Sequence, residues 1–90
     1  MANITHGMNP DEVDRLGREL QRIAGQIESM MNTLNSHVGQ TTWVGPDANT
    51  FKNQWWPGHR SKLQQIRNDL DGFGQSALNN ASEQRRVSGH

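Results

Sequence analysis

The chain has no cysteine and no tyrosine, and its only aromatic residues are two phenylalanines and three tryptophans among 90 residues. Without cysteine no disulfide can form, so stability has to come from packing or from a partner. Hydrophobic residues make up only 31% of the chain, and a chain this short buries a smaller fraction of its surface than a domain of ordinary size does. We therefore expect one small domain with a limited core.

Long hydrophobic runs are also absent. No stretch near the N-terminus resembles the apolar centre of a signal peptide, and none elsewhere is long enough to span a bilayer. Nine basic residues balance nine acidic ones, so no long-range attraction to nucleic acid or to an anionic membrane is built in. The sequence predicts a soluble, unprocessed protein that binds no nucleic acid.

A first helix is predicted to begin in the segment NPDE. Asn9 is a good N-cap, Pro10 suits the first helical position, and Asp11 and Glu12 complement the positive end of a helix. Apolar residues then recur every three or four positions, as in the a and d positions of a heptad. They are Val13, Leu16, Leu20, Ile23, Ile27, Met30 and Leu34.

The apolar face of this helix is wider than a simple two-stranded seam. The next heptad position, e, holds Gly17, Ala24, Met31 and Val38, so the face can contact two neighbours. Gly39 follows the last periodic residue, as a glycine that ends a helix does. We expect the helix to run from about Pro10 to about Val38.

A second helix is predicted to begin at Pro46, preceded by Gly45 and followed by Asp47. Its apolar residues are Phe51, Trp55, Leu63, Ile66, Leu70, Phe73 and Ala77. The spacing from Trp55 to Leu63 is eight residues instead of seven, and Pro57 removes a backbone donor in this interval. We expect a kink or a break there.

The two adjacent tryptophans of the second helix point in different directions. We place Trp55 in the seam of the hairpin, whereas Trp56 is either a boundary residue of the core or an interface anchor, because tryptophan is enriched among binding hot spots. The helix is expected to end near Ala81. The hairpin domain then covers residues 9–83, with flexible tails at 1–8 and 84–90.

The connector GQTTWVGP contains Trp43, a large aromatic residue where a simple loop would need only small polar ones. We expect Trp43 to close the corner of the hairpin by covering Leu34, Val38 and Phe51. Gly45 would allow a backbone conformation or a close approach that a β-carbon forbids. The sequence therefore predicts an all-α fold, a helix-turn-helix hairpin of two long antiparallel helices.

Candidate chemistry is sparse. His6, His37, His59 and His90 are far apart in sequence, and none is spaced as in a zinc site. Two helices also offer no deep pocket or oxyanion loop. We expect no enzymatic activity, no metal and no cofactor, so the function has to be sought in surfaces.

Trp43-Val44-Gly45, placed midway between two amphipathic helices in a chain of this length, resembles the WXG family of small proteins of bacterial type VII secretion, typified by the early secreted antigenic target. The resemblance covers about residues 9–83. It implies a hairpin that dimerises into a four-helix bundle, with the apolar residues named above forming both cores, and a virulence-factor-like protein exported without a cleaved signal peptide. The implied partner is a second copy, a sister protein, the secretion ATPase or a larger toxin.

One feature departs from the family pattern. Family members commonly carry a Tyr-x-x-x-Asp/Glu export signal after the second helix, and this chain has no tyrosine. Either the protein travels with a partner that carries the signal, or it works by another route. The alternative function is a cytoplasmic helical adaptor or regulator in which the Trp-x-Gly turn is coincidental.

Overall fold

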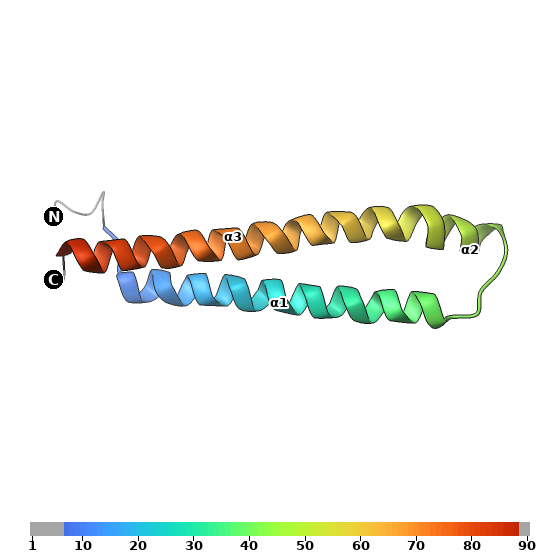
Figure 1. The fold of residues 1–90 in the computed structure, drawn as a ribbon, viewed down its shortest axis with the longest axis horizontal. Helices are drawn as coiled ribbons and strands as arrows, with labels where there is room; N and C mark the ends of the chain where they lie inside the picture. Colours follow the sequence, from blue (N-terminus) through green and yellow to red (C-terminus); the bar gives the residue numbers. More distant parts are fainter. Residues whose placement is uncertain (1–6, 89–90) are drawn as a thin grey trace.

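The computed structural model describes residues 7–88, and the side chains of 7–87. It is a hairpin of two long antiparallel helices, with both ends of the chain at the same end of the molecule (Figure 1). The elements are α1 (Pro10–Gln40), α2 (Pro46–Thr50), the π-helix η2 (Phe51–Trp55) and α3 (Trp56–Ser88). The last three form one continuous helical run. The predicted all-α hairpin is confirmed, while most of the expected tail 1–8, with His6, and residues 89–90 lie outside the described residues.

Helix α1 begins where its cap predicts. The side-chain oxygen of Asn9 accepts hydrogen bonds from the backbone amides of Asp11 (3.0 Å) and Glu12 (3.2 Å), which satisfies two of the free donors at the helix start. The helix continues through Gly39 and ends at Gln40. Thr41 closes it by donating both its amide and its hydroxyl to the carbonyl of His37. The predicted end near Val38 is therefore two residues early.

The turn depends on Gly45, whose φ of +122° lies in a region that side chains with a β-carbon rarely adopt. Pro46 follows as the first residue of α2. On the other side of the turn, the Lys52 ammonium donates to the carbonyls of Thr41 (3.1 Å) and Trp43 (3.2 Å). The connector is thereby attached to the second helical run.

The predicted irregularity before Pro57 is a π-helix. Within η2 the hydrogen bonds skip one extra residue, and the amide of Trp56 donates to the carbonyl of Phe51. A π-helical turn holds one more residue than an α-helical turn, so Trp56 follows Phe51 by five residues after a single turn. Pro57 comes after this irregular turn, and the residues from Trp56 to Leu63 form regular α-helix. The helix neither stops nor restarts here, and the possible break at Pro57 is wrong.

The second helix does not end near Ala81, because α3 continues to Ser88. Residues 84–88 were expected to form part of a flexible tail. Instead they are helical, and Arg85 pairs with two carboxylates at the start of α1. This pairing joins the last turns of α3 to the first turn of α1, and no local sequence pattern indicates it.

The two helices pack through small residues. In the described part of the chain, the buried positions are Gly17, Ala24, Met31, Ala48, Trp56, Gly74 and Ala81. The molecule measures 65 × 20 × 14 Å between Cα atoms, which is one layer of helices about 10–12 Å in diameter. A single layer has no interior, and accordingly no large side chain among the described residues is fully buried.

Candidate interaction surface

Six of the large apolar side chains that are exposed belong to the predicted core. They are Leu16, Met30, Leu34, Trp55, Ile66 and Phe73, with exposed fractions between 45% and 63%. The heptad stripe was expected to form the seam of the hairpin, but the seam of α1 is shifted by one position. The buried residues Gly17, Ala24 and Met31 occupy e positions, and the half-buried Val13, Leu20 and Ile27 occupy a positions. Of the d positions, Leu16 and Met30 are exposed and Ile23 is half-buried.

Apart from Trp55, these exposed residues share one side of the hairpin with the half-buried Ile23, Leu63 and Leu70. We call this side the apolar face: Leu16, Ile23, Met30, Leu34, Leu63, Ile66, Leu70 and Phe73. Met30 and Leu34 of α1 and Leu63 of α3 line the same shallow groove. From Leu63, Ile66 is rotated about 60° one way around the helix and Gln64 about 100° the other way. Since Gln64 lines a polar groove on the other side, Ile66 extends the apolar side, and Phe73 does so from Leu70.

The groove in this face has a volume of about 240 Å³ and is lined by Ile27, Met30, Met31, Leu34, Trp56 and Leu63. All six side chains are apolar apart from the indole nitrogen of Trp56. An apolar cavity of about 150 Å³ accommodates benzene, so this groove has room for an aromatic side chain. We call it the apolar groove.

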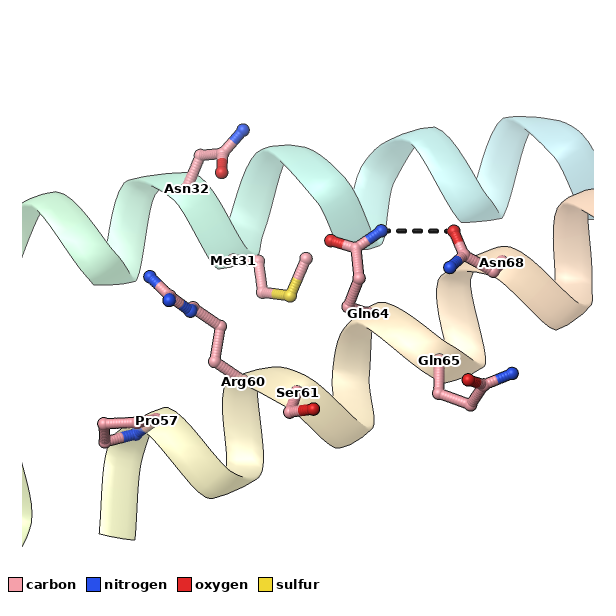
Figure 2. Close-up of a pocket in the computed structure, with 8 residues that line it drawn as sticks. All are labelled: Met31, Asn32, Pro57, Arg60, Ser61, Gln64, Gln65 and Asn68. Carbon is pink, nitrogen blue, oxygen red and sulfur yellow. Dashed lines mark hydrogen bonds between the residues drawn. The ribbon is translucent and has the colours of Figure 1, made fainter. Parts of the chain in front are cut away.

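The opposite side of the seam has different chemistry. Figure 2 shows a groove between α1 and α3 where Asn32, Arg60, Gln64 and Asn68 surround the buried Met31. The amide of Gln64 donates to Asn68 at 3.1 Å. The two sides of the hairpin therefore differ, one apolar and one rich in amides. Apolar side chains on a single side favour one partner bound to that side.

The placement of the two tryptophans is reversed from the prediction. Trp56 is 4% exposed, and its indole N–H donates to the Asn35 side chain at 2.9 Å, whereas Trp55 is 50% exposed. Trp56 lies seven residues before Leu63 within the regular helix α3, so it is in phase with the seam, whereas Trp55 is one residue out of phase. Trp56 is thus a core residue of the hairpin, and Trp55 is the exposed one.

Trp43 closes the corner only in part. Its ring lies 5.8 Å from the ring of Phe51, and the two line a small groove with Leu34 and Val38. These are the contacts expected from the sequence, but Trp43 remains 43% exposed. The row of rings continues from Phe51 to Trp55 at 5.2 Å and from Trp55 to His59 at 3.9 Å. The turn therefore presents aromatic surface next to the apolar face.

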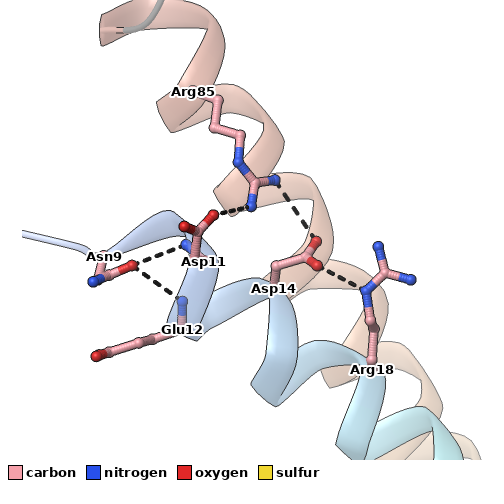
Figure 3. Close-up of polar contacts among 6 residues, drawn as sticks. All are labelled: Asn9, Asp11, Glu12, Asp14, Arg18 and Arg85. Atoms are coloured by element: carbon pink, nitrogen blue, oxygen red, sulfur yellow. Dashed lines mark hydrogen bonds and ion pairs between the residues drawn. The ribbon is translucent and has the colours of Figure 1, made fainter.

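Charges hold the opposite end of the hairpin together. Arg85 reaches from α3 to Asp11 at 2.8 Å and to Asp14 at 3.8 Å, and Asp14 also pairs with Arg18 at 2.7 Å (Figure 3). The hydrogen bond from Arg18, with smaller contributions from the charges of Arg18 and Arg85, lowers the pKa of Asp14 below its ordinary value. The hydrogen bond to Asp11 raises the pKa of Arg85.

An ion pair also crosses the seam near its middle, where the Arg67 guanidinium nitrogen Nε lies 2.9 Å from Glu28. Both side chains are partly covered. Arg67 lies seven residues before the buried Gly74, at a position where a seam would ordinarily hold an apolar residue. A charged pair at such a position favours one register of α1 against α3. Arg67, Gly74 and Ala81 were not among the predicted seam residues, although their spacing of seven indicates a seam.

The described residues contain no cluster of histidine, cysteine or acidic side chains that could hold a metal ion. Among the same residues, no helix is both long and apolar enough to cross a membrane. The chain matches no family model, no curated protein and no solved structure. The features that remain for assigning a function are the apolar face, the aromatic turn and the polar opposite side.

Proposed function

We propose that the protein is a non-enzymatic component of a bacterial type VII secretion system, either a secreted substrate or a co-secreted partner, and that it acts by pairing its apolar face with another helical hairpin. The observation that carries the proposal is a one-layer hairpin with Trp43-Val44-Gly45 at its turn and large apolar side chains along one side. Two such layers make a four-helix bundle, in which these side chains become the core.

The lack of tyrosine bears on how such a protein leaves the cell. A hairpin that pairs with a sister protein can use the sister's export signal, so the signal need not lie in this chain. The partner in this proposal is a second copy or a sister protein of the same size. The secretion ATPase or a larger toxin with a helical leader are further partners of the assembled pair.

Export is tested in the bacterium that makes the protein. We expect the full chain in the culture medium, with its N-terminus uncleaved, only while the secretion ATPase is intact. A strain that lacks the neighbouring gene for a sister protein tells whether the signal comes from that partner. Retention in the cytoplasm under all conditions would contradict the proposal. It would favour the alternative, a cytoplasmic helical adaptor or regulator, which the absence of a tyrosine-based export signal also favours.

A further inference from the structure

The elongated hairpin exposes more surface than its mass requires. Its accessible surface is 6555 Å², whereas a compact monomer of 10.2 kDa exposes about 5,300 Å². The excess of about 1,200 Å² is larger than the roughly 800 Å² that each partner buries in a standard protein interface. One more layer of the same size is enough to cover this face.

We propose, as a refinement that rests on the proposed function, that this layer is a second copy of the same chain, running antiparallel, with Phe73 of each copy inserted into the apolar groove of the other. Phe73 is 63% exposed on the apolar face. It is the only phenylalanine there, and the groove has room for a phenyl ring.

The positions along the hairpin agree with this arrangement. Gly17 and Gly74 lie opposite each other across the seam, so Ile66 of α3 is level with Gly25, the middle residue of α1. Phe73 lies seven residues from Ile66 toward the chain ends. The α3 wall of the apolar groove, Trp56 and Leu63, is centred nearly the same distance, about 10 Å, toward the turn. A two-fold axis at Ile66 therefore carries Phe73 onto the groove.

Symmetry fixes which helices meet. A two-fold axis that lies in the plane of the apolar face and runs perpendicular to the helices makes the two hairpins antiparallel. It places α3 on the partner's α3 and α1 on the partner's α1. The parallel alternative keeps every residue at its own level, so Phe73 would face the partner near Gly17, about 20 Å from the groove. Only the antiparallel arrangement brings the exposed ring and the groove together.

Charges at the rim of the face are complementary in the same arrangement. Lys62 and Asp69 are both exposed and lie on the same flank of α3, seven residues apart. An axis at Ile66 places Lys62 beside the partner's Asp69, and Asp69 beside the partner's Lys62. Asp69 accepts a hydrogen bond from Gln65 at 3.0 Å, which leaves its second oxygen open. The zero net charge of the chain adds no repulsion between copies.

The first experiment measures the dimer dissociation constant of the full chain by sedimentation. We expect a dimer at micromolar concentration and at least about a 100-fold weaker association for Phe73→Ala, since two buried aromatic anchors are lost per dimer. Ser61→Ala, at an exposed position that lines the polar groove on the other side, is the control and should leave the constant unchanged. Circular dichroism checks that both variants remain helical, as expected for substitutions of exposed residues.

The second experiment tests the orientation. Lys62→Asp and Asp69→Lys should each weaken the dimer about tenfold, and the double variant should regain most of the loss. The chain has no cysteine, so Ile66→Cys introduces a single thiol close to the axis. We expect mild oxidation to join two Ile66→Cys chains by a disulfide, and Gln65→Cys chains not to be joined.

The outcomes separate this proposal from the proposed function. The arrangement is overturned if Phe73→Ala leaves the dimer dissociation constant unchanged, or if Ile66→Cys chains are not joined by a disulfide. A chain that stays monomeric alone and pairs only with a sister protein overturns the self-association, while the role in secretion stands. Failure of export in a strain where the dimer forms as described contradicts the proposed function and leaves the dimer intact.

Discussion

Gly17 and Gly74 face each other across a close approach of the backbones of α1 and α3. A β-carbon on Gly17 would lie 2.8 Å from the carbonyl oxygen of Gly74, and one on Gly74 would lie 2.7 Å from the carbonyl oxygen of Gly17. Real β-carbons essentially never come this close to backbone atoms. The two glycines therefore set the distance between the helices at this end of the hairpin, and with it the contacts of the neighbouring seam residues.

Gly74→Ala should destabilise the protein by about 1–3 kcal/mol, because the helices must move apart to admit the methyl group. Gly72 provides a matched control two residues away, since a β-carbon there meets nothing within 4 Å. Gly72→Ala should stabilise the protein by about 0.5–1 kcal/mol through its higher helix propensity. Urea unfolding followed by circular dichroism measures both. Equal effects of the two substitutions would contradict the close approach.

The helices themselves could be predicted because their signals are local. Asn9 and Pro10 mark the first start, Gly45 and Pro46 mark the second, and the apolar periodicity connects them. The sequence could not show which part of the apolar stripe faces the hairpin's own partner helix. That choice depends on small residues, such as Gly17 and Gly74, meeting across the seam, and their pairing is visible only once the register is known.

The two tryptophans show a second limit of prediction. The irregular spacing between Trp55 and Leu63 was visible, but it could be accommodated by a kink, a break or an extra residue in one turn. In the structure the irregular turn, η2, lies before Trp56, and Trp56, seven residues before Leu63, is the tryptophan that is buried. Likewise, the helical end of α3 depends on Arg85 and Asp11, which are 74 residues apart in sequence, so no local pattern could indicate it.

Trp56→Ala should cost about 3–5 kcal/mol, the usual range for removal of a large buried aromatic side chain. It also leaves the Asn35 side chain without the indole N–H that donates to it at 2.9 Å. Trp43→Ala should cost less, about 1–2 kcal/mol, because nearly half of the Trp43 side chain is already in water. Urea unfolding at one fixed protein concentration compares the two, since association also affects apparent stability. A larger loss of unfolding free energy for Trp43→Ala than for Trp56→Ala would mean that Trp43 is fully buried at the corner of the hairpin.

The pairing of Arg85 with Asp11 and Asp14 should make stability depend on pH. The pKa of Asp14 is lowered from 3.8 in the folded state, chiefly by the Arg18 hydrogen bond and further by Arg85. A carboxyl group whose pKa is lower in the folded state stabilises the protein above its unfolded pKa, and this contribution is lost as pH falls through the folded pKa. The melting temperature should therefore decrease below about pH 3.8.

Arg85→Gln isolates the part of this effect that depends on the contact between the two helices. The variant should melt below the wild type at pH 6, and the difference should shrink as the pH falls through the lowered pKa of Asp14. Arg86→Gln is the control, because Arg86 pairs only with Glu83 of its own helix. Hydrogen exchange at residues 82–88 should quicken in Arg85→Gln alone. Unchanged exchange there would show that packing, not this ion pair, holds the end of α3.

Pro57 provides a test of the π-helix. Proline lacks a backbone N–H and therefore leaves one carbonyl in the preceding turn without its helical donor. The π-helix η2 ends at Trp55, two residues before it. Pro57 itself is exposed, so Pro57→Ala restores a donor without removing buried surface. We expect this substitution to stabilise the protein by about 1–2 kcal/mol, less than the roughly 3 kcal/mol cost of proline in a regular helix, because η2 already relieves part of the clash. Gly58→Ala, where a β-carbon meets nothing within 4 Å, separates helix propensity from the restored hydrogen bond and should add about 0.5–1 kcal/mol.

If the proline also causes η2, Pro57→Ala should convert that segment to a regular α-helix. Phe51 would then rotate by about 100° around the helix relative to Trp56, and nuclear magnetic resonance would show the contact between the rings of Phe51 and Trp43 lost while Trp56 stays in the seam. A spectrum in which the contact between Phe51 and Trp43 is unchanged would mean that the packing of these rings maintains the π-helix, whether or not the proline is present.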